Sequence, residues 1–239
     1  MTSINKILVL TIALLSSHAE AAATPEFPLV SGRNAVSFDD SQFNNDYIGM
    51  GFVLDYQGQL YGVTAKHVLL VVNHPQIKHV DPAPVLRSWQ MSSPETTLEL
   101  GQLLNADATE ALDMSVLERD ALVFRVTDPG PFTPIKLSAN PPAIGEELFA
   151  LGCTFASADD CTQDVYAGRL LQTTEHNLLL DLDQVEPGSL RGLSGGPVVN
   201  AEGELVGIVS NVMPDADGVA RFAPANLDYL RSVLNRLAG

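Results

Sequence analysis

The stretch GLSGGPVV at residues 192–199 places Ser194 between small residues, just before a proline and a short apolar run. A tight turn of this composition can present the Ser194 hydroxyl to an acyl group while backbone N–H groups point at the same place. The same residue types are also the commonest turn formers, so a surface turn leading into a strand is the alternative. Which of the two holds depends on whether the chain supplies a base and an acid elsewhere.

The N-terminus carries the features of an export signal. A single lysine, Lys6, precedes the apolar run Ile7–Leu15, and small residues follow at Ala19–Ala23. This order is typical of a secretory signal peptide, which we place at residues 1–23. The apolar run is too short to span a bilayer. We therefore expect a secreted or periplasmic protein without a membrane anchor.

The composition excludes several classes of partner. The chain has 29 acidic and 13 basic residues, and its formal net charge is −16. Nucleic acids and anionic membranes bind basic surfaces, so this excess of acid argues against both. The sequence contains no metal-ligand cluster, phosphate loop or dinucleotide motif, so we expect no metal and no cofactor.

Two cysteines, Cys153 and Cys161, lie in one short stretch. In an exported protein such a pair forms an intrachain disulfide far more often than a metal site, which would need more ligands nearby. Closing this loop stabilises a fold by about 2.6 kcal/mol in the chain-entropy estimate. We expect the disulfide to stiffen a loop.

Short apolar strands separated by turns dominate the rest of the chain. Residues 47–54 and 59–64 form a hairpin around the turn at 55–58. Residues 24–46 are polar with little periodicity, which predicts an irregular N-terminal lead-in. The regular spacing indicates an all-β fold of sandwiches or barrels. Further strands are predicted at 84–91, 96–103, 121–126, 143–152, 166–173, 177–182, 198–199 and 205–212.

A proline- and glycine-rich segment at 128–142 is interpreted as a linker between two halves, 47–127 and 143–239. The only predicted helix closes the second half, with Asn226 as its N-cap. Its apolar residues recur at helical spacing and form one stripe. They are Leu227, Leu230, Val233, Leu234 and Leu237.

A base and an acid are available for Ser194. His67 stands where the second strand of the hairpin ends, and Asp120 begins a strongly apolar strand. A lone histidine in such a place is more often a solvated or capping residue. An acyl-transfer site, however, needs a hydroxyl, a neutral imidazole to take its proton, a carboxylate to orient the imidazole, and N–H donors for the oxyanion. The chain supplies these in the order His, Asp, Ser.

Four segments together resemble the chymotrypsin-like serine peptidases, most closely the bacterial trypsin-like and HtrA-type branch. The resemblance extends over residues 47–237, and it implies two antiparallel β-barrels with the active site in the cleft between them. The barrels would lie at 47–127 and 143–239, the second with the C-terminal α-helix. The segments are VTAKHV at 63–68, DALVFRV at 120–126, GLSGGP at 192–197 and GIVS at 207–210.

The resemblance also implies roles for individual residues. His67 would be the general base, Asp120 the acid that orients it, and Ser194 the nucleophile. The oxyanion would bind the backbone N–H groups of Gly192 and Ser194. The acid stays open, because Asp113 and its apolar neighbours also resemble the family pattern. We favour Asp120, since a longer strand follows it and the linker comes at the expected distance.

For substrate binding, the resemblance places Gly188 near the base of the specificity pocket. Ser210, Asn211 and Val212 would form the strand that pairs with an extended substrate peptide, a form of β-augmentation. The pocket has no acidic residue at its base, so a preference for lysine or arginine is not indicated. Val212 stands where the family often has glycine, which favours a small or medium apolar residue before the scissile bond.

Three further positions bear on specificity and activation. Arg191 and Arg221 could instead favour an acidic residue in the substrate, or both could be solvated surface charges. Leu193 precedes the nucleophile where digestive members of the family have an acid that receives a newly cut N-terminus. We therefore expect no activation by that ion pair.

The predicted function is that of an exported serine endopeptidase that acts on proteins or peptides through an acyl-enzyme. The alternative is an inactive peptidase homologue that serves as a peptide- or protein-binding module. A serine esterase of the α/β-hydrolase type would need alternating helices and strands and the order Ser, Asp, His. The sequence shows neither feature.

Overall fold

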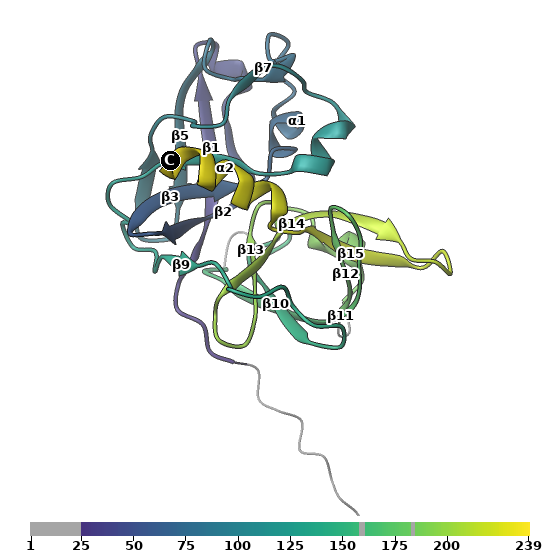
Figure 1. Ribbon diagram of the computed structural model, residues 1–239. Coiled ribbons are helices and arrows are strands. Elements are labelled where there is room, and N and C mark those ends of the chain that lie inside the picture. The colour runs from purple at the N-terminus through teal and green to yellow at the C-terminus, as the bar shows by residue number, and fades with distance from the viewer. Residues whose placement is uncertain (1–24, 158–160, 183–184) are drawn as a thin grey trace, which may run out of the picture.

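The computed structural model describes residues 25–157, 161–182 and 185–239. The predicted signal peptide at 1–23 lies outside the described residues. Figure 1 shows two bodies of strands, one above the other, with helix α2 (Asp228–Ala238) running from the lower body back across the upper one. The predicted all-β class with two antiparallel barrel-like bodies and a C-terminal helix is confirmed.

The upper body is a sheet curled into a half-barrel, in the order β6-β5-β1-β2-β3-β8, with β9 paired in parallel to β2. The irregular segment 101–104, which follows β6, joins the two ends of the curl. In it, the Gly101 N–H donates to the Arg125 carbonyl at 2.9 Å and the Leu104 N–H to the Val123 carbonyl at 2.7 Å. The strands are β1 (Ser31–Phe38), β2 (Asn45–Tyr56), β3 (Gln59–Thr64), β5 (Leu86–Ser92), β6 (Thr97–Leu100), β8 (Leu122–Arg125) and β9 (Ile135–Lys136).

The lower body is a closed antiparallel barrel in the order β10-β11-β12-β15-β14-β13. The register of β10 against β11 is regular from Glu147–Arg169 to Gly152–Asp164. The hairpin of β14 and β15 projects from this barrel (Figure 1). The strands are β10 (Glu147–Gly152), β11 (Asp164–Thr173), β12 (Leu178–Leu182), β13 (Pro197–Val199), β14 (Leu205–Pro214) and β15 (Ala220–Ala225).

Short elements connect these strands. Strands β4 (His79–Val80) and β7 (Asp107–Ala111) form a separate two-stranded ladder beside the upper body. Helix α1 (Val68–Val72) begins directly after His67 and was not predicted. It ends at Asn73, which adopts a left-handed conformation with φ 50°. The 3₁₀ helices are η1 (Ser41–Phe43), η2 (Met114–Arg119) and η3 (Pro187–Leu190).

Helix α2 belongs to the second half of the sequence but packs on the first body. Its buried residues Leu230, Val233 and Leu234 lie in one apolar cluster with the core of the upper sheet. The predicted N-cap is wrong by one residue, because Leu227 holds the cap position. The Asn226 side chain still accepts the Asp228 N–H at 3.1 Å, which is the bond from the second following residue that an N-cap at Asn226 would make.

The prediction of an irregular lead-in over 24–46 is wrong for residues 31–38, which form β1 at the centre of the upper sheet. The residues facing the core are Asn34, Val36 and Phe38. They follow the alternation of a strand, but a polar asparagine stands at one inward position and hides it from a hydrophobicity pattern. The tertiary structure accepts Asn34 because all its side-chain hydrogen-bonding groups find partners.

Asn34 joins several strands through a buried network. Its Nδ2 donates to the Met50 carbonyl at 2.6 Å and to Thr64 Oγ1 at 3.0 Å, and its Oδ1 accepts the Trp89 Nε1–H at 3.0 Å. Thr64 Oγ1 also donates to the Met50 carbonyl at 2.7 Å. Since burying an unpaired polar group is costly, this network makes the central position of β1 specific for asparagine.

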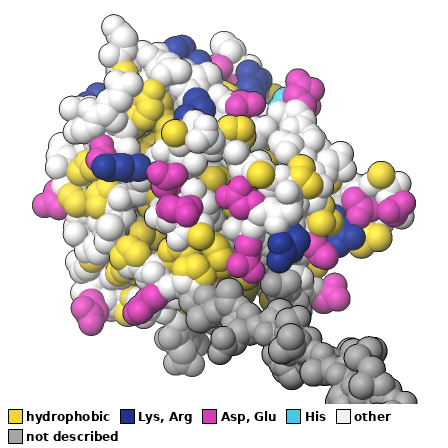
Figure 2. Space-filling view, turned by 60° about the horizontal axis from the view of Figure 1, so that its bottom comes forward, with side chains coloured by type: hydrophobic (Ala, Val, Ile, Leu, Met, Phe, Trp, Pro, Cys, Tyr) yellow, Lys and Arg dark blue, Asp and Glu magenta, His cyan; other side chains and the backbone are white. Residues whose placement is uncertain are grey.

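Acidic side chains are dispersed over the face of the molecule that Figure 2 shows. Figure 2 shows Asp and Glu side chains scattered over the visible face rather than gathered in one patch. Lys and Arg side chains lie among them. On this face the excess of acid, part of the net charge of −16, does not by itself mark a site.

Replacing Asn34 by alanine should destabilise the protein by about 2 kcal/mol or more, because it leaves the Trp89 indole N–H without its acceptor inside the core. Chemical denaturation measures the free energy of unfolding. Ser88→Ala on β5 is the control, since Ser88 is half-buried and shares a single 2.6 Å hydrogen bond with Ser37. An Asn34→Ala protein no less stable than Ser88→Ala would contradict the importance of the network.

Candidate active site

The structure brings His67 and Asp120 into direct contact. His67 Nδ1 lies 2.7 Å from Asp120 Oδ2, and the His67 backbone N–H donates to Asp120 Oδ1 at 2.9 Å. The Asp120 side chain is fully buried, while that of His67 is 14% exposed. One carboxylate therefore holds both the ring and the peptide of His67, and this fixes the Nδ1–H tautomer that leaves Nε2 free to accept a proton.

Ser210 bonds the same carboxylate from the other body. Its hydroxyl, on β14, donates to Asp120 Oδ2 at 2.5 Å. Sequence reasoning assigned Ser210 to substrate binding only and missed this bond. The two residues are 90 positions apart, and a hydroxyl near the middle of an apolar strand carries no signal of its partner. Asp120 thus lies where the two bodies meet.

The environment of Asp120 acts on its pKa in opposite directions. Burial is the largest effect and by itself raises the pKa. The charge of His67 and the hydrogen bonds from His67 and Ser210 together outweigh burial and hold the pKa below its usual value. Asp120 is therefore ionised at neutral pH and can stabilise a positive charge on His67.

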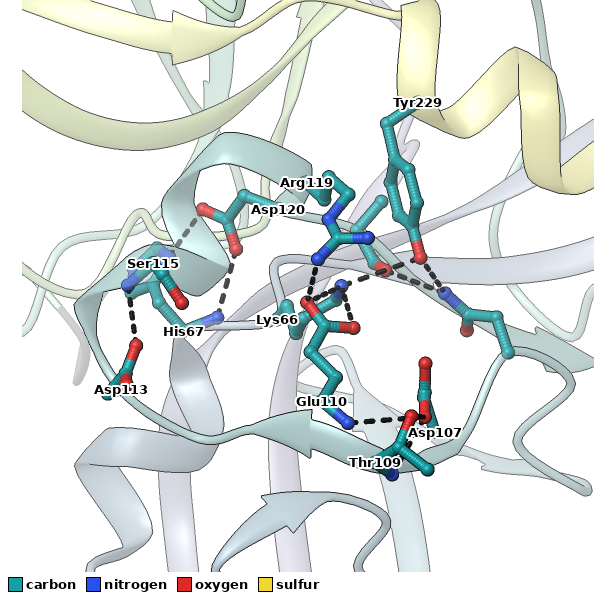
Figure 3. Close-up of polar contacts among 12 residues, drawn as sticks. Lys66, His67, Asp107, Thr109, Glu110, Asp113, Ser115, Arg119, Asp120 and Tyr229 are labelled. Atoms are coloured by element: carbon teal, nitrogen blue, oxygen red, sulfur yellow. Dashed lines mark hydrogen bonds and ion pairs between the residues drawn. The ribbon is translucent and has the colours of Figure 1, made fainter.

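Asp113 has a different surrounding. Its carboxylate accepts the Ser115 N–H at 2.8 Å and caps η2. Figure 3 shows Asp113 bonded to Ser115, while Asp120 is the carboxylate bonded to His67. The hydrogen bonds from Ser115 lower the pKa of this exposed group. The geometry favours Asp120 over Asp113 as the partner of His67.

The Ser194 turn presses against the end of β3, three residues before His67. The Met50 N–H donates to the Ser194 carbonyl at 2.7 Å. Gly195 has φ +85°, and a Cβ there would lie 2.2 Å from Thr64 Oγ1 and 2.3 Å from the Met50 carbonyl. Only glycine fits this contact. The turn from the lower barrel is thereby docked on the upper body beside His67.

Within the described chain, the half-buried Ser194 hydroxyl and His67 Nε2 make no hydrogen bond to each other or to another group. Hydrogen bonds between nucleophile and base are often long in resting enzymes and shorten when substrate binds. Both atoms are thus unengaged, one as a proton donor and the other as an acceptor.

The N–H groups of the turn fall into two sets. The N–H groups of Leu193, Gly195 and Gly196 donate to backbone carbonyls, which are those of Leu190, Val209 and Leu193 in turn. Those of Gly192 and Ser194 donate no hydrogen bond to any described residue. Two N–H donors without a partner, with one residue between them, are what an oxyanion hole needs.

The predicted disulfide between Cys153 and Cys161 is confirmed, with a Cα–Cα distance of 5.8 Å. Its loop packs against the turn, since the Phe155 N–H donates to the Arg191 carbonyl at 2.8 Å. Gly192, at φ +102°, lies so close that a Cβ would fall 2.5 Å from the Phe155 nitrogen. The loop therefore braces the Gly192 peptide.

Tyr47 and Leu193 anchor this region further. The Tyr47 hydroxyl donates to the Cys153 carbonyl at 2.5 Å, and burial raises the pKa of this phenol well above its ordinary value, so it remains a donor. Leu193 is completely buried in the core of the lower barrel. The position before Ser194 is thus filled by apolar packing.

The predicted substrate-binding residues lie on η3 and on β14 of the lower body. Gly188 is exposed in η3 with open space where a Cβ would stand. Val212 is 44% exposed on β14, opposite Phe222 of β15. The neighbouring Asn211 has a buried Oδ1 without a hydrogen-bond partner.

Arg221 is not available to bind an acidic substrate residue. Its guanidinium is paired with Asp215 at 2.8 Å and with Asp181. Arg191 is exposed beside the turn. No group of three or more His, Cys, Asp or Glu side chains that could hold a metal ion occurs in the part of the chain that the structure describes.

The ionised state of Asp120 should appear in the pH dependence of stability. Because its pKa in the folded chain lies below the ordinary 3.8, the stability it contributes is present above this pH and is lost as pH falls through the folded value. The free energy of unfolding of the wild type should therefore decrease more steeply on acidification than that of Asp120→Asn.

Urea denaturation at pH values from about 2 to about 6 measures this difference. The control is Asp46→Asn, because Asp46 is exposed and its side chain makes no hydrogen bond or ion pair with another described residue. It should keep the wild-type slope. Equal slopes for the wild type and Asp120→Asn would refute the effect of burial and bonding on this carboxylate.

Comparison with known proteins gives a consistent result. The profile described as the trypsin-like peptidase domain matches residues 49–208. The mouse (Mus musculus) serine protease HTRA3 is 28% identical over 152 residues, which make up 62% of this chain and 32% of that protein. The chain thus spans about a third of the length of this relative.

Solved structures show the same fold. The active form of the Rv3671c protease from M. tuberculosis has a TM-score of 0.59 and 14% identity, covering 98% of this chain and 92% of that chain. The serine endoprotease from Yersinia pestis has a TM-score of 0.54 and 19% identity, covering 88% of this chain and 62% of that chain. At these identities the likeness shows the fold alone.

Proposed function

Because the chain belongs to the trypsin-like peptidase family, we propose that it is a serine endopeptidase that hydrolyses peptide bonds through an acyl-enzyme. The single observation that carries the proposal is the bonding of His67 by the buried, ionised Asp120 beside a serine turn with two unpaired N–H groups. Protein or peptide substrates follow from the family.

In the proposed mechanism, His67 Nε2 takes the proton of the Ser194 hydroxyl as its oxygen attacks the scissile carbonyl. The N–H groups of Gly192 and Ser194 bind the oxyanion of the tetrahedral intermediate. Asp120 stabilises the protonated His67, which then gives its proton to the leaving amine. Water, activated by the same histidine, hydrolyses the ester on Ser194 and restores the site.

In the same proposal, the substrate binds as an extended strand along Ser210–Val212. Beyond Val209, β14 has no neighbour on the side away from β15 in the described ladders, so its backbone groups are open to a peptide. By the family resemblance we infer that Val212 narrows a specificity pocket whose base lies near Gly188, while Arg221 is held by its own acidic partners. These features favour a small or medium apolar residue before the scissile bond.

A fluorophosphonate probe tests the nucleophile. We expect the wild-type protein to be labelled at Ser194 at neutral pH and Ser194→Ala to give no label, because the probe reacts only with a serine activated by a base. Hydrolysis of fluorescein-labelled casein should be lost in parallel. Absence of labelling in the folded wild type would favour the inactive, peptide-binding homologue.

The acid is tested by a matched pair of variants. Asp120→Ala should lower kcat/KM by about 10⁴-fold, as loss of the orienting carboxylate does in other triads. Asp113→Ala removes only an exposed cap of η2 and should retain activity within about threefold of the wild type. The opposite pattern would assign the acid to Asp113.

We also propose export to the periplasm or the medium by cleavage of the signal peptide at 1–23. Its apolar run and small residues support this proposal. Across the described residues, the structure contains no helix long and apolar enough to cross a membrane. N-terminal sequencing of the protein recovered outside the cytoplasm should begin at Thr24. Recovery only of cytoplasmic protein that retains Met1 would reject export.

A further inference from the structure

A buried ion pair that the proposed mechanism does not use lies directly beside the candidate triad. Lys66 immediately precedes His67, and its side chain is 0% exposed. Its ammonium lies 2.9 Å from both carboxylate oxygens of Glu110, whose side chain is 7% exposed. Figure 3 shows this pair between the strand that leads to His67 and the segment that leads to Asp120.

Glu110 also reaches the residue before the acid. The Arg119 guanidinium, directly N-terminal to Asp120, lies 3.7 Å from Glu110 Oε1. A single carboxylate therefore contacts the side chains that precede both His67 and Asp120 in the sequence. The segment from Glu110 to Asp120 is therefore bonded in two ways. Glu110 contacts Arg119 near its end, and Asp120 bonds His67.

Helix α2 completes the cluster through Tyr229. Its hydroxyl lies 3.4 Å from Lys66 Nζ, and the centre of its ring lies 4.6 Å from the same atom. Asn105 Nδ2 donates to this hydroxyl at 3.4 Å and to the Ala121 carbonyl, just after Asp120, at 2.9 Å. We call Lys66, Asn105, Glu110, Arg119 and Tyr229 the Lys66 cluster.

Stability alone does not account for this cluster. Removing two charges from water is expensive, and apolar residues of similar size in place of a buried ion pair often leave a protein equally stable. What an ion pair with two close contacts supplies is a fixed geometry. Here the fixed groups are the backbone segments on either side of His67 and Asp120.

We propose that Glu110 is a positioning residue that sets the contact between His67 and Asp120 through Lys66 and Arg119, and that Tyr229 couples helix α2 to the same contact. The consequence for catalysis rests on the proposed function. A small displacement of the His67 ring relative to Asp120 lowers the rate of proton transfer. It does not change the surface that binds the peptide.

The test is the neutral double variant Lys66→Met/Glu110→Gln, which removes both charges and leaves neither one buried alone. We expect an unchanged melting temperature within a few degrees, a fall of about 10- to 100-fold in kcat, and KM within about threefold of the wild type. An internally quenched peptide with valine before the scissile bond serves as substrate. The control is Arg87→Gln/Asp39→Asn, which removes an exposed ion pair of 2.8 Å that has no bond to His67, Asp120, Ser194 or the Lys66 cluster and should keep wild-type kcat.

A spectroscopic readout reports the contact itself. The Nδ1 proton of His67, shared with a carboxylate at 2.7 Å, should give a low-field proton resonance that is present in the wild type and in the control. It should move upfield or broaden in the double variant. Tyr229→Phe keeps the ring over Lys66 but removes the hydroxyl, so it should show a smaller fall in kcat and a smaller shift.

The outcomes separate this inference from the proposed function. A folded double variant with wild-type kcat and an unchanged resonance would overturn the positioning role. If the double variant does not fold, Tyr229→Phe decides, and wild-type values of both readouts in it would overturn the coupling to α2. If the wild type neither labels nor hydrolyses substrate, the proposed function fails, while the resonance still tests whether the Lys66 cluster holds His67 against Asp120.

Discussion

The burial of one ionised carboxylate constrains the rest of this molecule. Asp120 is out of contact with water, and a carboxylate in that position must be bonded by donors or lose its charge. Two of its bonds come from His67 in the upper body, and one comes from Ser210 in the lower barrel. Separating the two bodies would expose this charge to water or remove one of its hydrogen-bond donors. Residues that join the two bodies are therefore also residues of the candidate site.

A second junction between the bodies depends on glycine. Gly195 lies against Thr64 and the Met50 carbonyl at a distance that no side chain would allow, and the Met50 N–H holds the Ser194 carbonyl. The buried Asn34 network also binds this Met50 carbonyl, through Asn34 Nδ2 and Thr64 Oγ1. Strand β1 thus supports the serine turn although it contributes nothing to the chemistry. The position of Ser194 is set by packing from the upper body as much as by its own loop.

These junctions explain which features the sequence could predict. The hairpin of β2 and β3, the later strands and the serine turn follow from local alternation and turn residues, so short-range patterns were sufficient. Strand β1 was missed because Asn34 interrupts its apolar face, and α1 because its five apolar residues carry no helical period. The bond of Ser210 to Asp120 joins residues 90 positions apart, and no local pattern contains it. The predicted roles of His67, Asp120 and Ser194 rest on motifs, and the structure adds the bonds around Asp120.

The Lys66 cluster extends the same reasoning to charge. In the proposed mechanism the base must be held still relative to the acid, yet His67 must keep one face open to substrate and so cannot be enclosed by packing. Constraint has to come from the neighbouring residues in the chain, and Lys66 and Arg119 are those neighbours. Under the proposed positioning role, pairing both with Glu110 constrains the backbone on the closed side while the imidazole edge remains free. Because Tyr229 and Asn105 link this pair to α2 and to the Ala121 carbonyl, the same proposal makes the C-terminal helix a support for the site as well as a cover for the upper core.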